Sequence, residues 1–298
     1  MSEILETKEK IIICFDASEL DTFEACQFKW HLSSHLNLKP KVTKPYLEMG
    51  ALIHYLLELH YKSKMINPFV EPIKREEIIE LGRVKSLEFD LSLEEVGEHI
   101  FQYREYARYY EDETTENIIP VAVEEPFLVK IFEDDDLIVY VQGKPDLIFR
   151  YSNSNDLILM DHKRVSRDSN ISALRNQFLL YCVACQTDTF IVNKVGFQKS
   201  YKPKERFKRV PFIYNKEILD EWKTEVVGRA REMILAQQFE SYPKNRSSCE
   251  KWDGCWYQRY CTTRPSAREF LIGTEFIISE SWDVSKGLED KNVTNKME

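Results

Sequence analysis

The spacing of apolar residues divides the chain into a helical first part and a strand-rich middle. Ile11–Phe15 is a short apolar run that predicts a strand, and Ser18 with Asp21 three residues on predicts a capping box that begins a helix. Apolar residues then recur at helical spacing from Met49 to Lys62 and through residues 74–112. These patterns predict one helix followed by two or three more.

From Pro120 the pattern changes to short runs of β-branched and aromatic residues between polar turn clusters. This predicts an antiparallel meander of four strands, over residues 121–132, 137–142, 146–151 and 157–162. The remaining pattern predicts a helix over about 169–184, strands over 189–196 and 207–213, and a long helix over about 216–238. Together these elements predict an α/β protein.

Charge and hydropathy narrow the class of protein. The 298 residues carry 41 Lys and Arg against 50 Asp and Glu, a net charge of −9, which argues against a surface attracted to nucleic acid over its whole extent but leaves room for a local basic groove. The apolar runs are too short to cross a bilayer, and the first residues lack the pattern of a secretory signal. We therefore expect a soluble cytoplasmic protein with no membrane partner.

A pair of aspartates gives the strongest chemical signal. Asp146 ends the segment Gly-Lys-Pro-Asp, and Asp161 and Lys163 follow an apolar strand in Asp-His-Lys. Neighbouring strands joined by a turn would place both carboxylates at one end of the sheet, where they suit Mg²⁺ or Mn²⁺. Asp161 and Lys163 lie two apart and share a face of the strand, so the lysine can orient a water or a phosphate oxygen. Taken alone, the pattern is weak evidence for a metal site, because aspartates at strand ends and solvent-exposed lysines produce the same pattern.

Two further motifs extend the pair into an ordered series. The predicted helix over 49–62 carries Gly50, His54 and Glu58 at four-residue intervals, and the helix after the lysine carries Gln177 and Tyr181. In this order the motifs resemble the PD-(D/E)xK nuclease superfamily. The flanking residues are similar to its RecB-like branch, which includes nuclease domains of bacterial recombination exonucleases (AddB-type) and the iron–sulfur nucleases of CRISPR adaptation. The resemblance covers about residues 18–265.

The resemblance implies a fold and a set of roles. It implies a restriction-endonuclease-like core with a mixed central sheet flanked by helices, an N-terminal helical region and a C-terminal iron–sulfur clasp. The implied metal ligands are His54, Asp146, Asp161 and the backbone carbonyl of His162, with Lys163 as the catalytic lysine beside the two aspartates. Gln177 and Tyr181 would contact the DNA backbone or support the site. Glu58 would hold the other nitrogen of the histidine, with a plain surface glutamate as the alternative.

The cysteines add a second implied centre. Cys26 lies in a segment that resembles the N-terminal part of iron–sulfur members, and Cys249, Cys255 and Cys261 would complete a [4Fe–4S] cluster. The first interval of this chain's Cys-x5-Cys-x5-Cys is three residues longer than in the family. Four thiolates also suit zinc, and ordinary thiols are the third possibility. We expect the remaining cysteines to be core thiols: Cys14, Cys182 and Cys185.

A basic segment over residues 199–209 indicates where nucleic acid would lie. It holds six basic residues and one acid, with Tyr201 and Phe207 placed to stack on bases, and a solvated hairpin loop is the alternative. The candidate phosphate contacts are Lys202, Lys204 and Arg206, together with Arg164 and Arg167 after the catalytic lysine.

The resemblance thus implies a Mg²⁺- or Mn²⁺-dependent deoxyribonuclease, acting as an exonuclease on single-stranded DNA or DNA ends. DNA is the implied partner, in a bacterial, archaeal or phage-infected cell, and a helicase, recombination or CRISPR partner protein stays open. A catalytically silent nuclease-fold scaffold in recombination or repair and a zinc protein of unrelated chemistry are the alternatives. The expected organisation is an arm over 1–17, a helical region over 18–119, the nuclease core over 120–244, a cysteine-rich segment over 245–283 and a disordered tail over 284–298.

Overall fold

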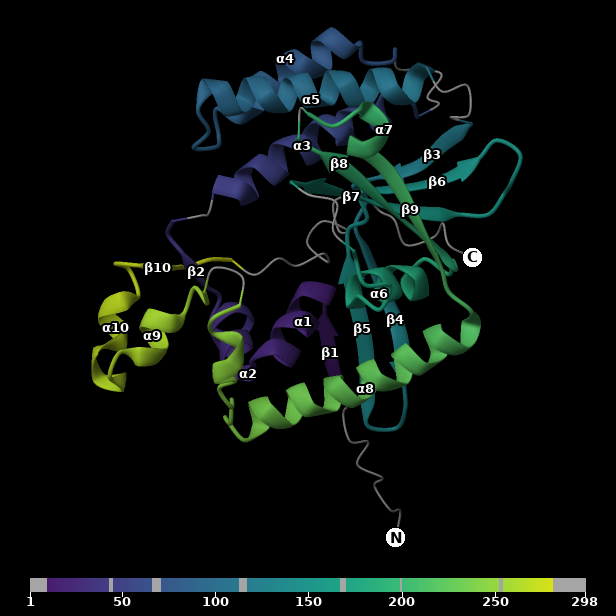
Figure 1. Cartoon of the computed structure of the whole chain (residues 1–298). Coiled ribbons are helices and arrows are strands. Elements are labelled where there is room, and N and C mark those ends of the chain that lie inside the picture. The colour runs from purple at the N-terminus through teal and green to yellow at the C-terminus, as the bar shows by residue number, and fades with distance from the viewer. Residues whose placement is uncertain are drawn as a thin grey trace. The chain divides into compact units, whose positions relative to one another are not determined.

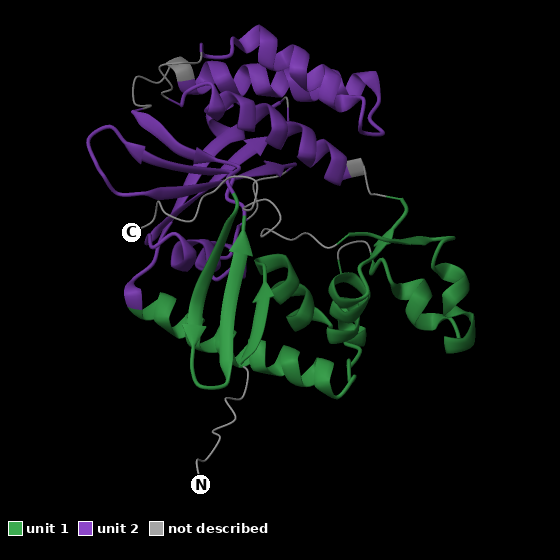
Figure 2. Ribbon diagram, turned by 180° about the vertical axis from the view of Figure 1, so that it is seen from behind, with its two compact units in different colours: residues 1–42, 126–143, 217–298 green, residues 43–125, 144–216 purple. Residues whose placement is uncertain are grey.

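The computed structural model describes residues 10–42, 45–65, 71–112, 117–166, 170–198, 200–251 and 254–280. The chain forms two compact units, each assembled from separated segments (Figure 2). Unit 1 contains residues 1–42, 126–143 and 217–298, and unit 2 contains residues 43–125 and 144–216. The tail expected over 284–298 and the candidate Arg167 lie outside the described residues.

Unit 2 is built on a five-stranded mixed sheet of order β3-β6-β7-β8-β9 (Figure 1). The strands are β3 (Ile118–Val123), β6 (Leu147–Tyr151), β7 (Ile158–Val165), β8 (Thr189–Gly196) and β9 (Phe207–Ile213). The pair β7–β8 is parallel and the other pairs are antiparallel. A parallel pair needs a crossover connection, and helix α6 (Asn176–Ala184) supplies it.

Helices cover both faces of this sheet. One face carries α3 (Pro45–Lys62), α4 (Arg75–Ser86) and α5 (Leu93–Asp112). Their apolar sides form one cluster that includes Leu56, Ile100 and Tyr103. The other face carries α6, whose Phe178 stacks on Phe190 of β8 at 4.3 Å between ring centroids. The expected α/β class, with a mixed central sheet flanked by helices, is therefore confirmed.

Unit 1 has a three-stranded sheet of order β1-β5-β4. Its strands are β1 (Ile11–Phe15), β4 (Phe127–Glu133) and β5 (Leu137–Gly143), and β1 runs parallel to β5. A second, two-stranded sheet pairs β2 (Leu38–Pro40) with β10 (Phe276–Ile278). The helical elements are α1 (Ala17–Ala25), α2 (Gln27–Trp30), a π-helical turn His31–His35, α8 (Lys216–Gln238), α9 (Gln258–Thr262), α10 (Arg268–Leu271) and two 3₁₀ turns, Arg246–Ser248 and Pro265–Ala267.

The expected single meander is wrong. Residues 121–132 form parts of two strands, β3 and β4, in different sheets. Glu124 has a left-handed backbone with φ of 53°, and Pro126 lacks the N–H that a continuing strand would donate, so the strand breaks between them. Likewise β5 pairs with β1 and β4, while β6 pairs with β3 and β7.

Three local predictions also need correction. Helix α1 begins one residue before Ser18, because the Asp16 carboxylate accepts the Glu19 N–H at 2.8 Å and is the actual cap. The helix expected from residue 169 begins at Asn176. Cys14 is exposed rather than part of the core, because it lies on the outward face of β1. In the described part of the chain, no helix is long and apolar enough to cross a membrane.

Candidate active site

The β6–β7 hairpin brings the two aspartates to one end of the sheet in unit 2. Asp146 directly precedes β6, and Leu147 pairs with Met160, the residue before Asp161. The His162 N–H donates to Asp146 Oδ2 at 2.6 Å, which fixes the Asp146 carboxylate against β7. The structure thus places these carboxylates as the sequence led us to expect.

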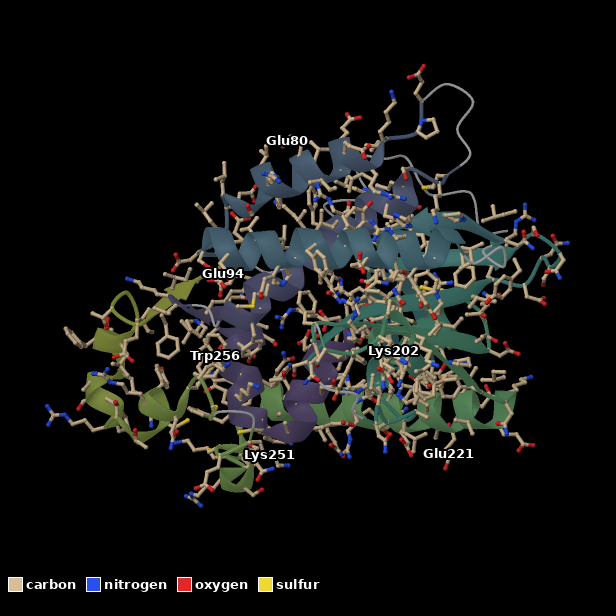
Figure 3. The ribbon with its side chains drawn as sticks, turned by 45° about the horizontal axis from the view of Figure 1, so that its top comes forward. Glu80, Glu94, Lys202, Glu221, Lys251 and Trp256 are labelled. Carbon is tan, nitrogen blue, oxygen red and sulfur yellow. The ribbon has the colours of Figure 1, made fainter. Side chains whose placement is uncertain are left out.

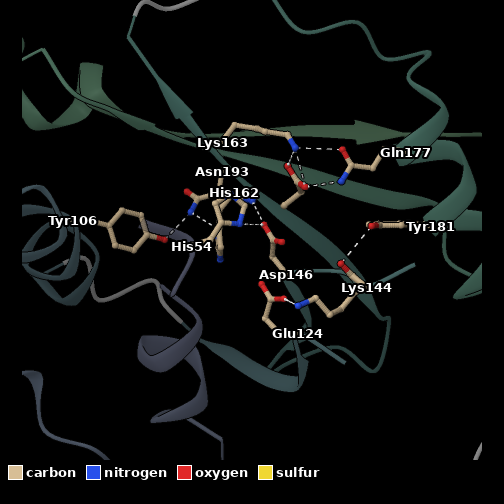
Figure 4. A network of polar contacts seen from close by, with 11 residues as sticks. His54, Tyr106, Glu124, Lys144, Asp146, His162, Lys163, Gln177, Tyr181 and Asn193 are labelled. Atoms are coloured by element: carbon tan, nitrogen blue, oxygen red, sulfur yellow. Dashed lines mark hydrogen bonds and ion pairs between the residues drawn. The ribbon is translucent and has the colours of Figure 1, made fainter. Parts of the chain in front are cut away.

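His54 and Glu124 complete a compact group with Asp146 (Figure 4). His54 reaches in from α3 and places Nδ1 3.3 Å from Asp146 Oδ2. Glu124 follows β3, and its N–H donates to the Asp146 carbonyl at 3.2 Å. The three residues offer ligand atoms that all lie within 4.8 Å of one another. Glu124 was not among the residues expected from the sequence. Its only signal there is an acid at a strand end, because its place depends on the β3–β6 pairing.

Asp161 and Lys163 form a second part of the site with Gln177. Gln177 Nε2 donates to Asp161 Oδ1 at 2.8 Å, and Lys163 Nζ donates to the same oxygen at 3.1 Å. Lys163 also donates to Gln177 Oε1 at 3.3 Å, so α6 holds the lysine against the carboxylate. Asp161 Oδ2 is buried and accepts no hydrogen bond, although Lys163 Nζ lies 2.8 Å away outside hydrogen-bonding geometry.

The surroundings of the two carboxylates shift their pKa values in opposite directions. Burial and the neighbouring Asp146 charge raise the pKa of Asp161 to about 6, against the lowering effect of Lys163. Burial also acts to raise the pKa of Asp146, but His54 and the His162 amide outweigh it and lower that pKa to about 2. The Asp146 carboxylate in turn raises the pKa of His54 against the effect of burial. The site therefore concentrates negative charge on Asp146.

These donors fit a divalent cation. Imidazole nitrogen and carboxylate oxygen together suit Mn²⁺, and Mg²⁺ accepts the same carboxylates while keeping waters. The buried Asp161 Oδ2, which no hydrogen bond satisfies, is the kind of atom that a cation would complete. His54, Glu124 and Asp146 are the residues that could hold it, with Asp161 beside them.

Tyr181 lies beside the site, whereas Glu58 has another partner than the expected histidine. The Tyr181 hydroxyl donates to the Lys144 carbonyl at 3.3 Å, and the Lys144 ammonium contacts Glu124. Tyr181 therefore supports the loop that carries Asp146. Glu58 pairs with Lys62 one helical turn on, at 2.6 Å, and the structure gives no contact between the described Glu58 and His54 side chains.

A polar network lies beneath the site on the face covered by α3 and α5. Asn193 of β8 donates to the Tyr106 hydroxyl at 2.9 Å and lies 2.8 Å from His162 Nδ1. Tyr61 of α3 stacks on the His162 ring and shares a 2.7 Å hydrogen bond with Tyr106. Burial lowers the pKa of His162 to about 3, so this imidazole is neutral. The network ties β7 to the helix that carries His54, and its scattered members gave no sequence signal.

The basic candidates divide into buried and exposed residues. Arg206 is 6% exposed and donates to Gln102 while pairing with Glu105 at 3.4 Å, so the predicted phosphate contact is wrong for this residue. Phe207 is 2% exposed in the core and cannot stack on a base. By contrast Lys202, labelled in Figure 3, is exposed, as are Lys204 and Tyr201.

Arg164 has packing and hydrogen-bond partners of its own on β7's other face. Its guanidinium lies 4.2 Å above the Phe197 ring, and its Nε donates to His99 Nε2 at 3.2 Å. Burial lowers the pKa of Arg164, which shows that its charge is partly withdrawn from water. These contacts join β7 to α5 and place Arg164 on the face opposite Lys163.

The four candidate cluster cysteines gather in unit 1. Burial raises the pKa of the Cys261 thiol. The pKa is raised further by the charges of three nearby thiols, those of Cys255, Cys26 and Cys249. Cys255 N–H donates to the Cys249 carbonyl at 2.8 Å, and Gly254 between them has φ of 90°. This turn, which favours glycine, closes the longer Cys249–Cys255 interval.

The other pair, Cys182 and Cys185, behaves as expected. Both are buried at the end of α6, and burial raises their pKa values to about 12 and about 11. They are core thiols, as the sequence predicted.

Comparison with known proteins gives a family match and a set of similar folds. The family model of the PD-(D/E)XK nuclease superfamily matches residues 15–262. Among solved structures, a putative exonuclease from Eubacterium rectale is 12% identical, with 87% of this chain and 92% of that chain covered at a TM-score of 0.53. An alkaline exonuclease from Laribacter hongkongensis is also 12% identical, with 65% and 95% covered and a TM-score of 0.33. No curated protein matches the sequence.

Proposed function

The chain belongs to the PD-(D/E)XK nuclease superfamily, and on that premise we propose that it is a metal-dependent nuclease that hydrolyses DNA phosphodiester bonds. One observation carries the proposal: His54, Glu124 and Asp146 converge within 4.8 Å, beside a lysine that Asp161 and Gln177 hold in place. A scaffold that kept only the fold would gain nothing from burying these charges together, because like carboxylates repel.

Each residue of the site has a separate role in the proposed hydrolysis. A divalent cation held by His54, Glu124 and Asp146 would polarise the scissile phosphate and acidify a bound water. Lys163 offers its ammonium protons to a phosphate oxygen or to the attacking water, and Asp161 and Gln177 keep the ammonium oriented. Tyr181 and Lys144 fix the loop on which Asp146 stands, which limits movement of the ligand carboxylate.

We propose further that the enzyme removes nucleotides from single strands or from DNA ends. Support comes from the Eubacterium rectale protein, which shares the fold and is described as a putative exonuclease. We assign the chain to the RecB-like branch on its motif series Gly50–Glu58, Asp146, Asp161-His162-Lys163 and Gln177–Tyr181.

A structural [4Fe–4S] cluster in unit 1 completes the proposal. Cys26, Cys249 and Cys255 each lie close enough to Cys261 to act on the pKa of its thiol. Around one zinc ion, thiolate sulfurs at 2.3 Å from the metal stand about 3.8 Å apart. Thiolates of a four-iron cluster bind different irons and stand further apart. Metal analysis of the purified protein therefore decides between iron–sulfur and zinc.

The test uses full-length protein purified without oxygen. End-labelled single- and double-stranded DNA is incubated with Mg²⁺ or Mn²⁺, and the label is placed at the 5′ or the 3′ end to reveal polarity. We expect degradation that requires the metal, falls by at least about 10³-fold in Lys163→Ala and Asp146→Asn, and persists in Lys74→Gln, which changes an exposed lysine at the start of α4. Folded, cluster-loaded protein without activity would favour the scaffold.

A further inference from the structure

The ring of His162 is the part of β7 on which helix α3 packs beside the metal group. Tyr61 follows His54 by about two helical turns, so both rings project from the same face of α3. The Tyr61 ring stacks on the His162 ring at 5.4 Å between centroids, and the His54 ring meets it edge-on at 6.1 Å. The position of the helix that supplies His54 is therefore set against the His162 ring.

The main chain of His162 holds a ligand carboxylate at the same time. Its N–H donates to Asp146 Oδ2 at 2.6 Å, and that oxygen lies 3.3 Å from His54 Nδ1. Asp146 and His54 both belong to the group that could hold the cation. A shift of His162 would therefore change the spacing of two of the three donors.

Two residues of other elements fix the His162 ring. Asn193 of β8 pairs with His162 across the parallel strands, and its Nδ2 lies 2.8 Å from His162 Nδ1. The same Nδ2 donates to the Tyr106 hydroxyl of α5 at 2.9 Å, so the two amide hydrogens account for both contacts. Tyr106 shares a 2.7 Å hydrogen bond with Tyr61, which stacks on His162. The polar network thus returns to its starting point.

The polar network is costly as a means of stability alone. Its four side chains are buried, none of them more than 2% exposed. Among the described residues, nothing hydrogen-bonds with Asn193 Oδ1 or with His162 Nε2. Buried polar atoms without partners destabilise a fold, and apolar residues of the same shape would avoid that cost. A network kept in this form beside the metal group is explained if it fixes the position of its members.

We propose that Asn193 and Tyr106 are positioning residues of the nuclease, which act through His162 to hold Asp146 and His54 at the spacing that binds the cation. The inference deepens the proposed function and rests on it. Both residues act at one remove, because His162 stands between Asn193 and the Asp146 carboxylate. Helix α5 thereby takes part in metal binding through a hydroxyl that is not itself a ligand.

Mn²⁺ binding measures this positioning without relying on cleavage. Full-length protein is titrated with Mn²⁺, and the free ion is followed by electron paramagnetic resonance. We expect Tyr106→Phe and Asn193→Ala each to raise the Kd for Mn²⁺ about 10-fold, as substitutions behind metal ligands do. The matched control is Tyr103→Phe, which removes another buried hydroxyl of α5, one that lies 3.4 Å from His60 Nδ1. This control should bind Mn²⁺ as the parent does, even where its melting temperature falls.

A double variant tests whether the two residues act along one path. Tyr106→Phe combined with Asn193→Ala should bind Mn²⁺ about as weakly as Asn193→Ala alone, because both changes remove the same support of His162. Two independent effects would instead multiply to about 100-fold, and that result would overturn the shared path.

The outcomes separate the positioning role from the nuclease. If the parent binds Mn²⁺ and cleaves DNA and both single variants keep its Kd, the positioning role is wrong and the nuclease stands. An equal rise of Kd in Tyr103→Phe would also overturn the positioning role. A parent that neither binds Mn²⁺ nor cleaves DNA overturns both proposals. Circular dichroism checks the fold of each variant, and if Asn193→Ala is unfolded, Tyr106→Phe decides, since it removes a single oxygen.

Discussion

Glu124 stands at the metal group in a backbone conformation that is uncommon for a residue with a side chain. Its φ of 53° costs of order 1 kcal/mol, a strain that proteins retain where function requires it. We predict that Glu124→Gln, which removes a ligand charge but little volume, raises the Mn²⁺ concentration for half-maximal activity about tenfold or more. It should also reduce the rise in melting temperature that Mn²⁺ gives.

The neighbouring residue provides the control for that experiment. Glu125→Gln makes the same change on an exposed side chain outside the ligand group, and its Mn²⁺ dependence should match that of the parent. Equal Mn²⁺ dependence in the two variants would remove Glu124 from the metal site.

Glu19 in unit 1 gives the protein a pH-dependent stability. Burial raises the pKa of this carboxyl from 4.5 to about 7, even though Trp30 Nε1 donates to it at 2.8 Å. The folded state therefore binds the proton more tightly than the unfolded state, so stability is highest below about pH 4.5 as far as this group is concerned and falls as pH rises to about 7. Glu19→Gln keeps the acceptor for Trp30 and avoids the buried charge.

Urea unfolding at pH 5 and pH 8 measures that effect. The Glu19→Gln variant should exceed the parent by about 2 kcal/mol at pH 8 and by clearly less at pH 5. Glu225→Gln, on the exposed side of α8, should leave the difference between the two pH values unchanged. A gain for Glu19→Gln of equal size at both pH values would refute the titration of Glu19.

Among the elements, two helical glycines should respond oppositely to the same substitution. Alanine favours a helix interior over glycine by about 1 kcal/mol. At Gly97 of α5 an added Cβ meets nothing within 4 Å, so Gly97→Ala should stabilise the protein by up to that amount. At Gly82 of α4 the Cβ would lie 2.5 Å from Leu56 Cδ2 in the core formed with α3, so Gly82→Ala should be neutral or destabilising. Thermal unfolding of the two variants checks the packing of α4 on α3, which is contradicted if Gly82→Ala is the more stable.

The sequence predicted the bounds of those elements that are determined by the local pattern of apolar and polar residues. The strands Thr189–Gly196 and Phe207–Ile213 and the helix Lys216–Gln238 have the expected bounds, because apolar periodicity and flanking polar residues act locally. The prediction failed where strand pairing with a distant segment determines the structure. Residues 121–132 are an example, because their two halves belong to strands of different sheets.

The candidate site follows the same division. The motif residues His54, Asp146, Asp161 and Lys163 do come together, whereas Glu124 and Asn193 enter only through strand pairing. Register is set by the alternation of buried and exposed faces over whole strands, and no short motif encodes it.

At the scale of the whole molecule, unit 1 unites the beginning, the middle and the end of the chain. Its first segment contributes β1 and Cys26, and its last contributes Cys249, Cys255 and Cys261. Asn245 donates to the Cys26 sulfur at 3.4 Å and to the Ala25 carbonyl at 2.9 Å, so the two segments already meet at this point. A cluster here would close a loop of roughly 220 residues, which by chain entropy is worth about 5 kcal/mol against the unfolded state.

This loop closure predicts what cluster loss does to the protein. Chain purified without oxygen should contain four irons and four sulfides, absorb broadly in the visible range and carry no stoichiometric zinc. Cys26→Ser and Cys249→Ser should each lose the iron and the colour and unfold at a melting temperature lower by several degrees or more. Cys14→Ser changes an exposed thiol outside the group and should keep both. Full iron content in Cys249→Ser would show that another residue binds the cluster in its place. Zinc at one ion per chain in the parent would show that the four thiols hold zinc instead of an iron–sulfur cluster. Since the same four thiols join the same segments in either case, the fall in melting temperature tests the clasp and the metal analysis tests its chemistry.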